Sequence, residues 1–156
     1  MTINNDHKCY MKKTMDVAIN SYPVENTPFA AIIVLDSKIL IATPNQEKST
    51  GDPTCHAEIN AIRKATKILN KSLLEGAILY TTCEPCPMCF IAAYLAKIRT
   101  IVYGIRVEDL TQYGWEVNIT AEEINKRSGS KIEIIPNVFR NECLKLFNLK
   151  YKGGFK

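Results

Sequence analysis

The sequence predicts an α/β protein: a three-layer α/β/α sandwich around a mixed five-stranded sheet. Two features of the chain lead to this prediction. Apolar runs at 29–35 and 38–42 flank the turn Asp36-Ser37, the pattern of an antiparallel hairpin. Helical and strand patterns then alternate, which predicts parallel neighbours joined by right-handed crossovers. The 156 residues suit one domain, residues 1–156, which can bury its own core.

The first part of the chain begins with a helix and ends in a polar loop. Residues 6–20 place apolar side chains near helical spacing, with lysines and an aspartate between them. The two hairpin strands follow. Residues 43–51 are polar and form a loop, and loops held by a rigid scaffold often carry binding residues.

The second helix is expected at 54–69 and is amphipathic. Its core-facing stripe has the spacing i, i+1, i+4, i+7 and i+8 and consists of Ala61, Ile62, Ala65, Ile68 and Leu69. Lys64, Lys67 and Lys71 are expected to face water.

The next elements are a strand at 77–81, a helix at 87–96 and a strand at 100–104. The helix is apolar on all sides, which predicts that it is buried between other elements. The short strand before it would deliver a cysteine-rich loop to the helix start.

The last third of the chain contains two helices and a strand. Thr120-Ala121-Glu122-Glu123 is a capping box for a helix that ends at Ser128-Gly129-Ser130, and 132–135 form a strand. The final helix shows apolar residues at i, i+4, i+7 and i+8, and the pattern continues past the helix. These residues are Phe139, Cys143, Leu146 and Phe147, then Tyr151 and Phe155.

Charge and cysteine content limit the class of protein. No stretch approaches the roughly 20 apolar residues that a membrane span requires, so we expect a cytoplasmic protein with no membrane partner. Six cysteines, three of them within 83–89, suit a reducing compartment. The net charge is +4, and residues 137–156 hold five basic residues against Glu142 alone. This basic tail suits either contact with the phosphates of RNA or a nucleotide, or a solvated helix face.

One stretch of the chain holds a histidine, a glutamate and two cysteines in an order that suits metal chemistry. Asp52 followed by Pro53, and Cys86 followed by Pro87, each predict a helix start. Thiols in a first helical turn ionise more readily, and thiolates bind zinc. Three protein ligands to one Zn²⁺ leave the fourth tetrahedral position for water, as in catalytic sites. The expected ligands are His56, Cys86 and Cys89, with Glu58 as the catalytic proton carrier beside that water.

His56-Ala57-Glu58 and Pro85-Cys86-Pro87-Met88-Cys89 match the H-x-E…P-C-x-x-C signature of zinc deaminases. The chain resembles the cytidine-deaminase-like superfamily over roughly half its length or more, from Thr27 to Gly104. Within it, the chain most resembles the guanine deaminase and tRNA adenosine deaminase branch. The resemblance implies zinc on the three ligands, proton transfer by Glu58 and hydrolytic loss of an exocyclic amine. We also expect a homodimer.

Cys83, Cys86 and Cys89 also form a C-x-x-C-x-x-C run, which could hold structural zinc or an iron–sulfur cluster. Neither alternative gives Glu58 a role, and a cluster would lack a suitably placed fourth thiolate. Outside the metal set, we expect packed or half-buried thiols at Cys9, Cys55, Cys83 and Cys143.

The resemblance also names substrate-binding residues. It assigns Asn45, eleven positions before His56, to the edge of the base, and the Ala57 backbone N–H to a substrate oxygen. Asn45 could instead be simple turn chemistry. Phe29 after Pro28 is typical of guanine deaminases, and its ring could stack on a purine or serve as a core aromatic.

Gly114-Trp115-Glu116 resembles a Gly-Phe-acidic stretch of guanine deaminases, so Trp115 and Glu116 are further candidates. The recognition carboxylate of that branch lies one position later, where this chain has Val117. Glu116 could replace it, because a carboxylate accepts hydrogen bonds from the guanine N1–H and 2-amino group. Leu95 also replaces an aromatic residue common in that branch. These departures leave the base open.

The sequence therefore predicts a zinc-dependent hydrolase that deaminates a small nucleobase or nucleoside, with guanine the leading substrate. A tRNA adenosine-to-inosine deaminase, with tRNA as its partner, is the alternative. A zinc-stabilised nucleic-acid-binding or regulatory subunit is an alternative of another class. Glu58 argues against it, because a binding module does not need a carboxylate beside an open metal position.

Overall fold

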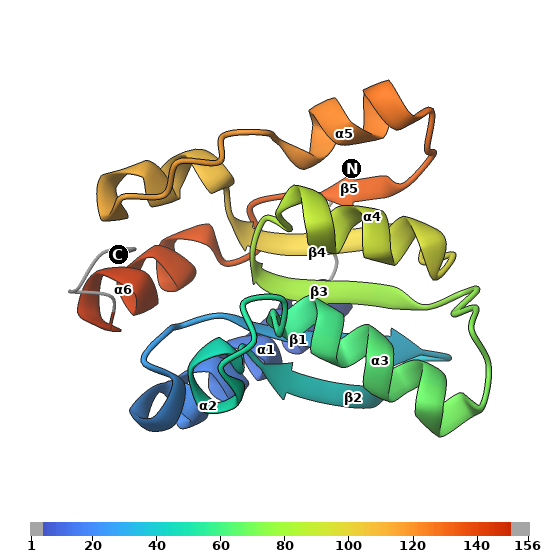
Figure 1. Cartoon of the computed structure of the whole chain (residues 1–156), viewed down its shortest axis with the longest axis horizontal. Helices are drawn as coiled ribbons and strands as arrows, with labels where there is room; N and C mark the ends of the chain where they lie inside the picture. The colour runs from blue at the N-terminus through green and yellow to red at the C-terminus, as the bar shows by residue number, and fades with distance from the viewer. Residues whose placement is uncertain (1–4, 151–156) are drawn as a thin grey trace.

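A computed structural model describes residues 5–150, which form a mixed five-stranded sheet between two layers of helices (Figure 1). The strands lie in the order β2-β1-β3-β4-β5. β1 pairs antiparallel with β2 and β3, while β3, β4 and β5 are parallel neighbours. The predicted hairpin and the parallel crossovers are therefore confirmed. The strands are β1 (Ala30–Leu35), β2 (Lys38–Pro44), β3 (Ile78–Cys83), β4 (Thr100–Ile105) and β5 (Glu133–Ile135).

Helices cover both faces of the sheet, with α3 and α4 on the viewer's side and α1 behind it in Figure 1. Alternate residues of β4 supply both cores: Ile101 and Tyr103 pack toward α3, α4 and α5, while Val102 packs toward α1 and α6. The two layers of the sandwich are therefore anchored on the same strands. The longer helices are α1 (Asn5–Glu25), α3 (Ala57–Leu69), α4 (Pro87–Leu95), α5 (Ala121–Ser128) and α6 (Arg140–Lys150).

The start of α3 differs from the prediction, since the helix begins at Ala57 and not at Thr54. Asp52 does not cap it. The Asp52 carboxylate instead accepts hydrogen bonds from the backbone N–H and the hydroxyl of Thr54, at 2.8 and 2.7 Å, and closes a local turn. His56 takes the N-cap position with extended backbone angles. His56 therefore lies immediately before the first turn of α3 and not within that turn.

Two short helices lie where the sequence indicated no regular structure. α2 (Glu47–Thr50) interrupts the polar loop, and the 3₁₀-helix η1 (Val107–Tyr113) follows β4. Neither segment is long enough for an apolar repeat to develop. Both helices contribute residues to the cavity beside the metal ligands. The sequence therefore predicted less regular structure around this cavity than the structure contains.

The prediction that α4 is buried on all sides is wrong. Phe90 and Ala93 are fully buried, but Ile91 is 38% and Leu95 66% exposed. Ile68 on α3, predicted to face the core, is also 55% exposed. An outer-layer helix buries only the face toward the sheet, so the remaining apolar residues of α4 are left on the surface.

The final helix follows its predicted pattern. Cys143 and Phe147 are fully buried and pack on the α1 side of the sheet. Tyr151 and Phe155, which were expected to continue the pattern, lie outside the described residues. Cys9, expected to be packed, is exposed on α1. Within residues 5–150 no helix is both long and apolar enough to cross a membrane.

Candidate active site and metal centre

The start of α3 and the start of α4 lie side by side and bring the predicted metal ligands together. His56 is the N-cap residue of α3, and Cys86 is the N-cap residue of α4 with Pro87 at the first helical position. Proline suits that position because its missing N–H would have no partner there. Cys89 lies in the first turn of α4 and is fully buried.

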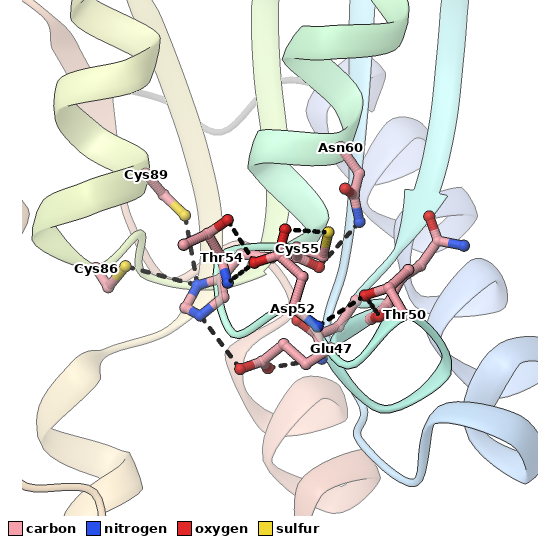
Figure 2. A network of polar contacts seen from close by, with 11 residues as sticks. Glu47, Thr50, Asp52, Thr54, Cys55, Asn60, Cys86 and Cys89 are labelled. Carbon is pink, nitrogen blue, oxygen red and sulfur yellow. Dashed lines mark hydrogen bonds and ion pairs between the residues drawn. The ribbon is translucent and has the colours of Figure 1, made fainter.

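The distances among these side chains fit zinc. His56 Nδ1 lies 3.6 Å from Cys86 Sγ and 3.5 Å from Cys89 Sγ, contacts drawn as dashed lines in Figure 2. Zinc takes nitrogen at about 2.0 Å and sulfur at about 2.3 Å, so tetrahedral ligands of these two types stand about 3.5 Å apart. The three ligand atoms all lie within 4.8 Å of one another. This group does not include Cys83, so the geometry does not favour a metal held by the C-x-x-C-x-x-C run.

The three expected ligands differ in how readily they lose a proton. A hydrogen bond from Cys89 lowers the pKa of Cys86 to about 4. Burial of Cys86 opposes this shift, and the contact with His56 adds to it. The same hydrogen bond and burial raise the pKa of Cys89 well above its usual range. Burial lowers the pKa of His56, but the contact with Cys86 and the nearby carboxylates outweigh it and raise that pKa to about 9. One thiolate therefore faces an imidazolium in the protein alone.

Glu58 lies in the first turn of α3, with only 7% of the residue exposed. The Thr81 hydroxyl donates a hydrogen bond to Glu58 Oε1 at 3.4 Å. Burial and the negative charge of Cys86 raise the pKa of Glu58, and His56 opposes that rise. A carboxyl group with a raised pKa beside a metal centre is suited to take up and return protons during a reaction.

A cavity opens onto this centre. The predicted substrate residues Phe29, Asn45 and Trp115 line it together with His56 and Glu58. Phe29 and Asn45 are neighbours, because the Asn45 backbone N–H donates to the Phe29 carbonyl at 3.0 Å. The remaining lining residues are Glu47, Cys83, Glu84, Cys86, Val107 and Leu110. The cavity lining therefore combines apolar and aromatic side chains with polar and charged ones.

Two predicted substrate residues lie differently. Glu116 is exposed and is not among the residues that line the cavity. Ala57 is buried, and its carbonyl accepts a hydrogen bond from the Thr43 hydroxyl at 2.8 Å. Trp115 is held by a hydrogen bond from its indole Nε1–H to the Val117 carbonyl at 2.7 Å. Of these two neighbours, Trp115 lines the cavity and Glu116 does not.

Sequence analysis missed two carboxylates at the cavity. Glu84 is buried and accepts hydrogen bonds from the backbone N–H groups of Val107 and Ala121, at 2.9 and 2.6 Å. It therefore fixes η1 and α5 against the cysteine loop. The sequence signal that could have identified Glu84 is its position directly before Pro85-Cys86. Glu47 on α2 accepts from Asn45 Nδ2 at 2.8 Å and lies 3.7 Å from His56 Nε2, and only its nearness to Asn45 could have drawn attention to it.

Comparison with known proteins agrees with this geometry. A model of the family described as the cytidine and deoxycytidylate deaminase zinc-binding region matches residues 4–105, which include all three expected zinc ligands and Glu58. The chain belongs to this family. As a member of this deaminase family, the protein is a zinc-dependent hydrolytic deaminase, and the iron–sulfur and binding-only alternatives are not supported.

Similar members of the deaminase family act on different substrates. A guanine deaminase from Bacillus subtilis (strain 168) is 37% identical over 122 residues, 78% of this chain and 78% of that protein. A tRNA-specific adenosine deaminase of the same strain is 31% identical over 134 residues, 86% of this chain and 81% of that protein. A solved structure from work on A-to-I editing by tRNA:A34 deaminases has a TM-score of 0.75 at 27% identity, over 88% of this chain and 98% of that one. The predicted fold class is thereby confirmed.

Proposed function

We propose that this deaminase acts on a free purine base, with guanine as the leading substrate. The observation that carries the proposal is the cavity itself, where Phe29 and Trp115 provide aromatic surface beside the metal centre and Asn45, only 2% exposed, provides a polar edge. Flat aromatic rings gain from stacking on aromatic side chains. The identity with a guanine deaminase supports the same substrate.

In this proposal His56, Cys86 and Cys89 hold the metal. Bound zinc would lower the pKa of a water molecule so that it is a nucleophile at neutral pH. Glu58 takes a proton from the attacking water and gives it to the ring nitrogen of the base. It then carries the second proton to the exocyclic amine, so that the C–N bond breaks, a carbonyl remains and ammonia leaves. Water is consumed, and Glu58 ends in its starting state.

The cavity walls would hold the base during these transfers. We assign stacking to Phe29 and Trp115 and hydrogen bonding of the base edge to the Asn45 side chain. The Ala57 backbone N–H as a contact for a substrate oxygen stays a prediction. Contact of Glu116 with the base also stays a prediction, and its exposed position offers no support for it.

An ammonia-release screen tests the substrate. Purified zinc-loaded protein would be supplied with guanine, adenine, cytosine, guanosine and a tRNA anticodon stem–loop. We expect the highest kcat/KM on guanine. Release of ammonia from the stem–loop with none from any free base would overturn the proposal.

A tRNA adenosine deaminase is the second candidate, favoured by the identity with tRNA-specific adenosine deaminases and by the basic residues of the C-terminal segment. Binding through phosphates releases counterions, so affinity for tRNA would fall steeply with salt. Filter binding of the stem–loop at about 50 and 200 mM salt is therefore combined with the ammonia-release screen, and salt-sensitive binding together with ammonia release from the stem–loop alone would identify the tRNA deaminase.

We further propose that the protein is a homodimer. Support comes from the exposed side chains of Ile91 and Leu95 on α4, because large apolar residues grouped on one helix face often mark a contact with another chain. The substitution Leu95→Glu would place a charge in that contact. Sedimentation equilibrium should then show a monomer, whereas a monomeric wild-type protein would contradict the proposal.

We also propose a cytoplasmic location. The centre requires reduced Cys86 and Cys89, and thiols persist where glutathione and thioredoxin keep them reduced. Fractionation of cells that express the protein at its natural level tests this assignment.

A further inference from the structure

Glu47 lies between a substrate-side residue and a metal-side residue. Its Oε2 accepts a hydrogen bond from Asn45 Nδ2 at 2.8 Å, and its Oε1 lies 3.7 Å from His56 Nε2. Figure 2 shows Glu47 below the centre, with dashed lines to both neighbours. No other carboxylate among residues 5–150 has an ion pair with His56.

The short helix α2 holds Glu47 at this place. The Ser49 backbone N–H donates to the buried carboxylate of Glu25 at 3.2 Å, which ties α2 to the end of α1. The Gln46 backbone N–H donates to the Cys55 carbonyl at 2.9 Å, which ties the start of α2 to the residue before His56. Glu47 is therefore fixed relative to the imidazole by contacts that do not involve its own side chain.

The contact with His56 has a direct chemical consequence. Nδ1 faces the two sulfur atoms, so it must present a lone pair if it is to bind a metal, and the ring proton must then lie on Nε2. Nε2 is the atom that faces Glu47. A carboxylate behind a metal-binding histidine favours that tautomer, restricts the ring and makes it a stronger ligand.

The contact with Asn45 has a second consequence. An ionised carboxylate can only accept hydrogen bonds, so Asn45 must turn its NH₂ group toward Glu47. Its Oδ1 is then available to accept a hydrogen bond from a ring N–H or an amino group of a base. The orientation of the amide thus depends on the charge at position 47.

We propose that Glu47 is a positioning residue that serves both halves of the site. It holds His56 with Nδ1 toward the metal, and it holds Asn45 with its carbonyl oxygen toward N–H donors of the substrate. The second role rests on the proposed function, whereas the first requires only that the three ligands bind zinc.

The metal role is tested by zinc affinity, measured by competition with a chromophoric chelator. Glu47→Ala should weaken zinc binding by about 10- to 100-fold, the usual effect of losing a partner of a metal-binding histidine. Glu47→Gln should lose less affinity than Glu47→Ala, because the amide keeps a polar oxygen and the size of the side chain near His56 Nε2 while it removes the charge. Glu75→Ala is the matched control, since Glu75 is exposed in the loop after α3 and away from this cavity, and it should bind zinc as the wild type does.

A spectroscopic measurement separates positioning from general loss of structure. In the zinc-loaded wild type, nitrogen NMR should show the His56 proton on Nε2. The Glu47→Ala protein should show a shifted Nε2 signal with faster proton exchange, while its thermal unfolding without metal stays close to that of the wild type. Wild-type zinc affinity together with an unchanged His56 signal in Glu47→Ala would overturn the proposal.

The substrate role is tested by steady-state kinetics at saturating zinc. Glu47→Gln lets Asn45 turn either way, so KM should rise several-fold while kcat, which depends on Glu58, changes less. An unchanged KM would overturn this role and leave the metal role standing. If the wild type deaminates no free base, the proposed function fails, and the zinc and NMR measurements still decide the metal role.

Discussion

Position 58 carries a buried carboxyl group, to which we assign several proton transfers. Glu58 is almost fully enclosed, yet it lies within reach of a hydroxyl donor, Thr81, and beside the charged Cys86. Because burial and that charge both disfavour the anion, the pKa of Glu58 is raised, which makes its carboxylate a stronger proton acceptor.

Replacement of this carboxyl group should separate chemistry from metal binding. Glu58 is not part of the three-ligand group, so Glu58→Ala should leave the zinc content and melting temperature nearly unchanged. Turnover should fall by about 10²- to 10⁴-fold, the usual contribution of a positioned general acid–base. Zinc content, thermal unfolding and ammonia release would be measured on the same preparation. Wild-type turnover in Glu58→Ala would rule out the proposed mechanism.

The cysteines should differ in reactivity once zinc has been removed. With a pKa of about 4, Cys86 is already a thiolate at pH 6, so its alkylation rate should change little between pH 6 and pH 8. Cys143 is fully buried, which raises its pKa to about 12, and it should react slowly throughout. Peptide mass spectrometry after short exposure to iodoacetamide measures both rates. Protection of Cys86 by added zinc is the control, and a tenfold loss of Cys86 rate per pH unit would contradict the assignment.

At the residue scale, the sequence sufficed for groups that are close along the chain or belong to one motif. His56, Glu58, Cys86 and Cys89 were all expected near one another from their spacing. Glu47 was not, because its role depends on α2 folding back onto the start of α3, and spacing alone does not reveal that contact.

At the scale of the elements, local signals failed where two of them competed. Asp52 and Pro53 predicted a helix start, but Asp52 bonds Thr54 and forms a turn, which delays α3 until Ala57. The capping box at Thr120 had no competitor, and its two reciprocal hydrogen bonds with Glu123 are present at the start of α5. Capping signals therefore predict a helix reliably only when the side chain has no nearer backbone partner.

Gly104 shows why β4 and α6 can approach closely. A Cβ atom at this position would lie 2.6 Å from the Thr82 carbonyl oxygen and within contact of Cys143 on α6. Gly104→Ala should therefore destabilise the protein by about 1–3 kcal/mol, as expected for overpacking in a core. Urea unfolding measures the change. Cys143→Ala alone, which removes a sulfur atom and adds no bulk, is the comparison, and equal stability of Gly104→Ala and the wild type would contradict this view of the contact.

At the scale of the whole molecule, the metal centre joins the starts of two helices that follow strands two positions apart in the sheet, β2 and β3. His56 comes from the start of α3 after the hairpin, and the two cysteines come from the start of α4 after β3. The α/β/α architecture was predictable because the helices and strands of each layer show apolar repeats in the sequence. The exposed apolar face of α4 was not predictable. A helix buried in the core and a helix with an exposed apolar face can have the same apolar sequence pattern.

Zinc should therefore stabilise the entire fold, and this stabilisation should depend on pH. The folded protein binds zinc at a preformed site, so free zinc at about 1,000 times its dissociation constant would add about 4 kcal/mol to the free energy of unfolding. Binding displaces the proton of His56, whose pKa is about 9, and that of Cys89, whose pKa is higher still, while Cys86 has already lost its proton above about pH 4. Protons thus compete with zinc over this whole range, so zinc affinity rises as pH increases from 6 to 8.

Melting temperatures at fixed free zinc should accordingly rise more on zinc addition at pH 8 than at pH 6. His56→Ala should abolish the zinc-dependent rise, because it leaves two thiol ligands. Cys83→Ser should retain it, because Cys83 lies outside the three-ligand group. Differential scanning calorimetry with and without a chelator gives each value. If Cys83→Ser removed the zinc-dependent rise and His56→Ala kept it, the ion would be held by the cysteine run as a structural metal, and the catalytic assignment of this centre would be wrong.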